Sequence, residues 1–221
     1  MKEQPYQWNQ VKRLKNKFFL LSNKTLQIGI TGGIGSGKST VCKVFSLLGI
    51  PIYNADDRAK WLMSYDSHLI QQLKENFGEE TYSSNGELNR SYLAQQVFND
   101  SNRVQILNQL VHPCVAKDYL AWVEENKNKT SYLIKEAALL YESGSYKGLD
   151  KIINVYAPIE LRIQRVQQRD LHRTEKEIRS IIEKQLSEEE RSKKADYIIY
   201  NDEKQFILSQ VIELHAIFSH S

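Results

Sequence analysis

The first clear block of apolar and polar positions predicts a strand, a turn, a helix and a second strand. Residues 26–30 form a short apolar run that ends in a glycine-rich stretch. Residues 39–48 place apolar side chains at the spacing of one helix face, and Gly49 is a residue type that commonly ends a helix. Residues 51–53 then predict the second strand. This order is that of a βαβ unit.

The rest of the chain continues this alternation of helices and strands. From residue 56 to about 123 the pattern is mostly helical, with a glycine-containing loop at 83–86. Further strands are predicted at 132–134, 151–156 and 195–200, and further helices at 161–194 and 206–218. Strands interleaved with helices favour an α/β fold, with a five-stranded parallel sheet that is covered by helices on both faces.

The composition is that of an ordinary globular chain. Hydrophobic residues make up 41% and charged residues 26%, which argues against a wholly disordered or fibrous protein. No apolar run approaches the roughly 20 residues that a membrane-spanning helix needs, so we expect no membrane span. Cys42 and Cys114 are too few for a disulfide framework and lie outside any C-x-x-C motif. We therefore expect a reducing, cytoplasmic location, with Cys42 packed as an ordinary thiol.

The net charge of +3 is unevenly distributed. Residues 1–25 hold six basic residues and one acidic residue, so they carry +5 and leave −2 for the remainder of the chain. The body is therefore not a basic surface, and we expect no nucleic-acid partner. We interpret residues 1–25 as a solvated basic extension, with a targeting peptide as the alternative. No pattern in the sequence indicates an oligomeric state.

A phosphate-binding pattern occupies residues 32–39, which read Gly-Gly-Ile-Gly-Ser-Gly-Lys-Ser and match G-x-x-x-x-G-K-[ST]. Glycines let the backbone wrap closely around phosphate oxygens, and the N-terminus of the following helix attracts negative charge. In such loops the lysine, here Lys38, reaches the β- and γ-phosphates, and the hydroxyl that follows it, here Ser39, is a ligand of Mg²⁺. The sequence thus predicts nucleotide binding through Gly33, Ile34, Gly35, Ser36, Gly37, Lys38, Ser39 and Thr40.

The loop alone does not say which reaction follows binding. GTPases carry an Asn-Lys-x-Asp motif, whereas residues 126–129 read Asn-Lys-Asn-Lys and lack the aspartate. Motor ATPases carry an apolar strand that ends in aspartate, whereas residues 152–156 run into Ala157 and Pro158. A small-molecule kinase is therefore favoured by elimination.

Several short motifs, in a fixed order along the chain, indicate which kinase family the sequence resembles. The chain resembles the dephospho-CoA kinase family from about residue 26 to residue 202, and only the N-terminal extension lies outside the resemblance. The motifs that carry it lie at residues 28–40, 48–51, 55–56, 86–90, 112–113, 139–142, 168–170 and 195–201.

The resemblance implies a P-loop kinase fold that binds ATP and Mg²⁺. The reaction it implies is transfer of the ATP γ-phosphoryl group to the ribose 3′-hydroxyl of dephospho-CoA, which yields CoA and ADP. It further implies a kinase domain at 26–202, with a helical coenzyme-binding region at about 57–123 and a mobile lid at about 161–194. Residues 203–221 would form a C-terminal helix that packs on the core.

The resemblance also implies that Asp56 is the catalytic base. Without it, the pattern favours a helix N-cap, because Asp56 stands directly before a helical stretch; the two roles are compatible. Asp57 is the competing carboxylate if the register slips by one residue. Two departures bear on this region: Asn54 stands where the family usually has an aspartate, and Ala137-Ala138 stands where many relatives carry a proline before the double leucine.

Four arginines, Arg162, Arg165, Arg169 and Arg173, are spaced so that one helix would place them on one face. A solvated charged helix is the ordinary interpretation. The resemblance to a lid implies instead that Arg165 and Arg169 bind ATP phosphates, with Arg162 and Arg173 as weaker candidates.

Four further residues complete the implied site. The resemblance places Arg90, His112 and Glu142 near dephospho-CoA, and Asn201 near the adenine. The alternatives are a packed structural role for His112, helix-end partners for Arg90 and Glu142, and a turn residue for Asn201.

Overall fold

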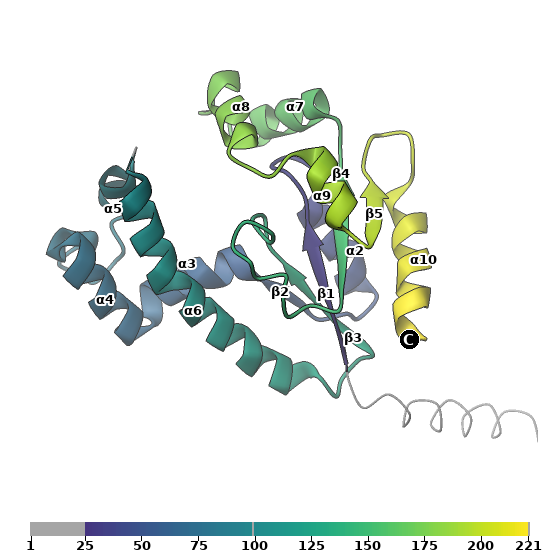
Figure 1. Ribbon diagram of the computed structural model, residues 1–221, viewed down its shortest axis with the longest axis horizontal. Coiled ribbons are helices and arrows are strands. Elements are labelled where there is room, and N and C mark those ends of the chain that lie inside the picture. Colours follow the sequence, from purple (N-terminus) through teal and green to yellow (C-terminus); the bar gives the residue numbers. More distant parts are fainter. Residues whose placement is uncertain (1–24, 99, 221) are drawn as a thin grey trace, which may run out of the picture.

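The computed structural model describes residues 25–98 and 100–220, so the predicted basic extension lies outside the described residues except for Thr25. Figure 1 shows a central sheet whose two faces are covered by helices. The five strands are all parallel and run in the order β2-β3-β1-β4-β5, which confirms the predicted fold. They are β1 Leu26–Thr31, β2 Ile52–Asn54, β3 Tyr132–Glu136, β4 Lys151–Tyr156 and β5 Tyr197–Tyr200.

Helices lie between successive strands along the chain, except that turns and bends alone connect β3 to β4. Between β1 and β3, the described residues form α2 Lys38–Leu47, α3 Ala55–Tyr65, α4 Ser67–Phe77, the short 3₁₀ helix η1 Glu79–Thr81, α5 Arg90–Val97 and α6 Ser101–Asn126. After β4 they form α7 Ile159–Arg169, α8 Glu175–Glu183, α9 Glu188–Lys194 and α10 Ile207–Ser219.

Most positions of the strands are apolar, as expected of a parallel sheet that helices cover on both faces. On one face, α2 and α10 pack against β1, β3 and β4, and Phe45 and Phe218 are almost fully buried there. On the other face, the C-terminal half of α6 and the segment after β3 pack against Leu133 and Ile152. Cys42 lies in the first of these layers, as expected, and burial raises the pKa of its thiol.

Helices α3 to α6 form a body of their own to one side of the sheet (Figure 1). Their shared cluster includes Leu69, Leu73 and Phe77. The body is joined to the edge strand β2 by Asp118 of α6. The Asp118 carboxylate accepts from the Arg58 guanidinium at 2.6 and 2.9 Å and from the Tyr53 hydroxyl at 2.7 Å.

The helix predicted over 161–194 is in fact three helices. Helix α7 ends at Arg169, and a capping box of Thr174 and Glu177 starts α8. Ser187 caps α9 in the same way, through its side-chain oxygen. Each cap satisfies N–H groups that a continuous helix would have satisfied internally, so the chain can turn at both places. Within the residues described, no helix is both long and apolar enough to span a membrane.

The end of α7 and the packing of its buried side correct the prediction that four arginines share one helix face. Arg173 lies in the turn beyond α7, where its Nε is 3.3 Å from Asp170. Arg162 is only 2% exposed and faces inward. Arg165 and Arg169 alone remain on an accessible part of α7.

Candidate active site

The phosphate-binding loop joins β1 to α2 at the carboxyl end of the sheet. Gly35 and Gly37 have φ angles of 77° and 93°, which side chains other than glycine rarely adopt. Gly37 stands directly before α2, and no side chain caps that helix. The first N–H groups of α2 are thus left open, and they form a ready anion-binding end.

Lys38 is the first residue of α2 and turns back over the loop. Its Nζ donates to the carbonyl oxygen of Gly32 at 2.9 Å. Burial lowers the pKa of Lys38, and the nearby carboxylates of Glu136 and Asp56 act against that shift. One cation and two carboxylates therefore meet where β1, β2 and β3 end.

Asp56 is the carboxylate that faces this meeting point, and Asp57 is not. Asp56 lies in the exposed first turn of α3, and its Oδ2 accepts from the Ala138 N–H at 3.3 Å. Asp57 instead accepts from Lys60 Nζ at 2.8 Å on the outside of the same helix. The N-cap reading of Asp56 is wrong: the cap is Asn54, whose Oδ1 accepts from the Asp57 N–H at 2.9 Å.

Glu136 is the acid that the sequence analysis missed. The third strand was expected to stop at Ile134, but β3 runs two residues further and ends in Glu136 beside β1. The side chain is 5% exposed, and burial raises the pKa of its carboxyl. The signal for it in the sequence is an acid two positions beyond the apolar run 132–134, with Lys135 between them.

Arg165 is tied to the phosphate-binding loop through Asn201. Its Nη1 donates to the Asn201 carbonyl oxygen at 3.1 Å, and Asn201 Nδ2 donates to the Ser36 carbonyl oxygen at 2.8 Å. Arg169 is placed differently. It binds the neighbouring Asp170 through two hydrogen bonds of 2.9 Å, and 64% of its side chain is exposed.

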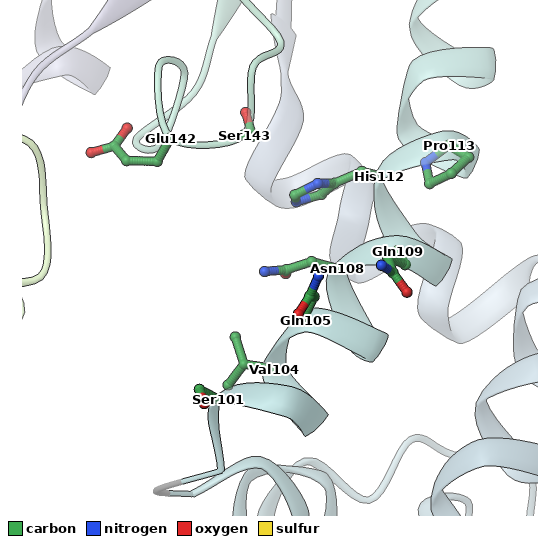
Figure 2. A pocket seen from close by; sticks show the side chains of 9 residues that line it. All are labelled: Ser101, Val104, Gln105, Asn108, Gln109, His112, Pro113, Glu142 and Ser143. Atoms are coloured by element: carbon green, nitrogen blue, oxygen red, sulfur yellow. The ribbon is translucent and has the colours of Figure 1, made fainter.

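A cleft of about 480 Å³ separates α6 from the segment after β3. Figure 2 shows His112 and the polar side chains of α6 on one wall, with Glu142 and Ser143 on the facing loop. Partial burial and the charge of Lys135 lower the pKa of His112. Glu142 also accepts from the Leu186 N–H at 2.8 Å, which links the cleft to the segment between α8 and α9.

The structure brings His112 and Glu142 together but leaves Arg90 apart from them. Arg90 lies at the start of α5 and lines a separate cleft with Ser64 and Tyr65. Within the described residues, Arg90 makes no hydrogen bond or ion pair with His112, Glu142 or the phosphate-binding loop.

Comparison of this chain with known proteins shows which family it belongs to. A model of the dephospho-CoA kinase family matches residues 26–206, more than half of the chain. The chain belongs to the dephospho-CoA kinase family. The dephospho-CoA kinase of Bacteroides fragilis (strain YCH46) is 37% identical over 86% of this chain and 92% of its own length. That of Chlorobium chlorochromatii (strain CaD3) is 40% identical over 82% and 87% of the two chains.

A solved structure agrees with this assignment. The dephospho-CoA kinase from Campylobacter jejuni matches this chain with a TM-score of 0.64 at 26% identity, over 87% of this chain and 96% of that one. The family resemblance found in the sequence is thus confirmed, and the chain is an ATP-dependent phosphotransferase.

In this member of the dephospho-CoA kinase family, both departures from the usual motifs supply an N–H group to a carboxylate. Asn54 donates from Nδ2 to Glu136 Oε2 at 2.6 Å, where an aspartate would bring a second carboxylate instead. Ala138 donates its backbone N–H to Asp56, and a proline has no such hydrogen. The two substitutions therefore change how Glu136 and Asp56 are held.

Proposed function

We propose that this chain transfers the γ-phosphoryl group of ATP to the ribose 3′-hydroxyl of dephospho-CoA, with Asp56 as general base, and yields CoA and ADP. The observation that carries the proposal is the position of Asp56 between the two halves of the site. Its carboxylate is near Lys38 of the phosphate-binding loop and is bonded to Ala138, which leads into the cleft wall at Glu142.

The cleft beside His112 is our candidate for the dephospho-CoA site. It is lined by amide and hydroxyl groups of α6 and the facing loop, which suit a polar acceptor with many oxygens. We assign the helices between residues 57 and 123 to acceptor binding and the segment 161–194 to the lid. Arg90 belongs to this region of the chain, although a contact with the acceptor would have to reach it through its separate cleft.

The residues at the phosphate-binding loop also fit Mg²⁺. Mg²⁺ prefers oxygen ligands and keeps several waters, so it needs only one or two protein oxygens beside the phosphates. The exposed Ser39 hydroxyl lies in the first turn of α2, next to Lys38, which has the Asp56 carboxylate among its neighbouring charges. The described residues contain no group of three or more His, Cys, Asp or Glu side chains suited to a metal, which agrees with a metal held mainly by nucleotide and water. When bound there, Mg²⁺ would neutralise charge on the β- and γ-phosphates.

The chain's own residues would carry the remaining steps by position and charge. Lys38 would leave its loop carbonyls and bind the transferred phosphoryl group, whose charge is met most fully in the transition state. Asp56 would orient the 3′-hydroxyl and accept its proton. Arg165 already stands at Asn201, on the side of the loop that we assign to adenine. Arg169 would have to exchange Asp170 for phosphate as the lid closes and excludes water.

Steady-state ADP release with matched acceptors tests the proposal. Dephospho-CoA should give rapid turnover with a product heavier by one phosphoryl group, while AMP, adenosine and water alone should give little. Equal turnover with AMP or adenosine would assign the site to another nucleotide or nucleoside kinase. Binding of ATP without turnover on any acceptor would make the chain a nucleotide-binding module.

We place the reaction in the cytoplasm, since both cysteines are free.

A further inference from the structure

Ile34, at the tip of the phosphate-binding loop, is held by the lid through both of its backbone groups. Its carbonyl oxygen accepts from Arg162 Nε of α7 at 2.9 Å. Its N–H donates to Gln185 Oε1, between α8 and α9, at 2.9 Å. These contacts join residues 128 and 151 positions apart in the chain.

The Ile34 side chain continues the same attachment. It packs into a small apolar cluster that is otherwise made only of lid residues: Ile163, Val166, Ile178 and Ile182. Ile163, Val166 and Ile178 are at most 3% exposed. The tip of the loop therefore contributes to the lid's own core, and a shift of α7 or α8 away from Ile34 would expose part of that apolar surface.

The Arg162 guanidinium lies directly against the loop backbone. A Cβ atom placed on Gly33 would stand 2.1 Å from Arg162 Nη2, and one on Gly35 would stand 2.4 Å from the Arg162 carbonyl oxygen. The glycines at 33 and 35 thus allow the lid to approach as well as the nucleotide. Arg162 and the buried Arg191 share the Glu188 carboxylate, at 3.4 and 3.0 Å, so the buried charge has a partner.

We propose that Arg162 and Gln185 are positioning residues for the phosphate-binding loop. They fix the peptide groups on both sides of Ile34, and so aim the N–H groups of Gly35 and of residues 37–39 at the phosphates of the bound nucleotide, while the Ser36 N–H donates to the Gly33 carbonyl oxygen. Because the same contacts belong to Arg162 of α7 and to Gln185 before α9, these two residues move with the loop as one unit. The inference rests on the proposed binding of ATP at this loop. It assigns the buried Arg162 a role in nucleotide binding at this loop, beside the more exposed Arg165 and Arg169.

Two substitutions of Arg162 separate the bond to Ile34 from the charge. In glutamine the side-chain nitrogen stands as many bonds from Cα as Arg162 Nε does, so Arg162→Gln can still donate to the Ile34 carbonyl. Arg162→Leu has a similar stem and no donor. In both variants Glu188 keeps Arg191 as its partner, so no buried carboxylate is left unpaired.

The readout is ADP affinity by calorimetry, with thermal unfolding beside it. We expect Arg162→Leu to weaken ADP binding by about tenfold or more, as for loss of a charge-assisted hydrogen bond, and Arg162→Gln by about threefold or less. The matched control is Arg179→Gln, because Arg179 is also a lid arginine but its side chain is 43% exposed and pairs with Glu160 and Glu175 rather than with the loop backbone. It should bind ADP like the parent chain.

Hydrogen exchange and a second variant complete the test. Backbone amides of residues 32–39 should exchange faster in both Arg162→Leu and Gln185→Ala. The second variant removes the acceptor of the Ile34 N–H and leaves the ion pair of Arg162 and Glu188 in place. KM for dephospho-CoA should stay unchanged in both. Gln185→Ala also serves if Arg162→Leu does not fold.

Three outcomes would overturn the inference. They are a folded Arg162→Leu chain with parental ADP affinity, equal losses in the leucine and glutamine variants, and unchanged loop exchange in Gln185→Ala. A parent chain that binds no ADP would instead overturn the proposed function.

Discussion

Replacing Asp56 by asparagine tests the central assignment of the site. The change keeps the size of the side chain and its ability to accept from the Ala138 N–H. It removes the negative charge and the capacity to take a proton. The helix cap is unaffected, because Asn54 makes it.

The structure separates the two effects of this change by magnitude. An acid in the first turn of a helix contributes about 0.3–1 kcal/mol, so the free energy of unfolding should fall by no more than that. A general base contributes about 10²–10⁴-fold to the rate. This range corresponds to about 2.7–5.4 kcal/mol of transition-state stabilisation. The expected loss of transition-state stabilisation is therefore larger than the expected loss in the free energy of unfolding, so partial unfolding cannot account for the fall in kcat.

Asp57→Asn is the matched control, since Asp57 lies in the same exposed first turn and pairs with Lys60. It should lose a similar fraction of stability and keep kcat within about threefold, as expected of an exposed pair. The assay is ADP release at saturating ATP and dephospho-CoA, with ADP affinity and denaturant unfolding for each variant. Ordinary turnover in a folded Asp56→Asn chain, or a larger loss from Asp57→Asn, would remove Asp56 from the catalytic role.

Three further predictions address the remaining charges. Lys38→Ala should lower kcat by about 10²-fold or more while thermal unfolding stays close to the parent, because Lys38 Nζ bonds only to loop carbonyls. Arg165→Ala and Arg169→Ala should each lower kcat more than they raise KM for dephospho-CoA, and a loss of acceptor affinity alone would make them acceptor ligands. Burial raises the pKa of Glu136, so the folded chain binds that proton more tightly than the unfolded chain, and stability falls as the pH rises. Glu136→Gln lacks this dependence, so denaturant unfolding between about pH 4 and 7 should favour the variant increasingly as the pH rises.

Residues 54 and 138 differ from those usual in the family, and for this reason the usual motif alone does not predict how the carboxylates of this site are held. Asn54 uses its amide oxygen to cap α3 and its amide nitrogen to hold Glu136. An aspartate could perform only the first task, and it would place a like charge beside a buried carboxylate. The second carboxylate of the site is thus at the end of β3, where no motif in the sequence pointed.

Local patterns in the sequence determined the sheet, its covering helices and the phosphate-binding loop. Apolar runs, glycine positions and helical spacing act over a few residues, so they need no knowledge of distant contacts. The β1–loop–α2 unit is the clearest example, since strand, loop and helix each followed from residues 26–48. The helix breaks at Thr174 and Ser187 were also local, but their caps were hidden within a charged stretch of helical composition.

Tertiary structure alone decided which charged groups meet. Asn54 and Glu136 are 82 positions apart, and Arg162 reaches Ile34 across 128. Strand order brings the first pair together, because β3 lies between β2 and β1 in the sheet. Packing of α7 against the loop makes the second contact and buries an arginine that helical spacing placed on a solvated face. No periodicity within either segment carries that information, since burial of a charge depends on the partner that folding supplies.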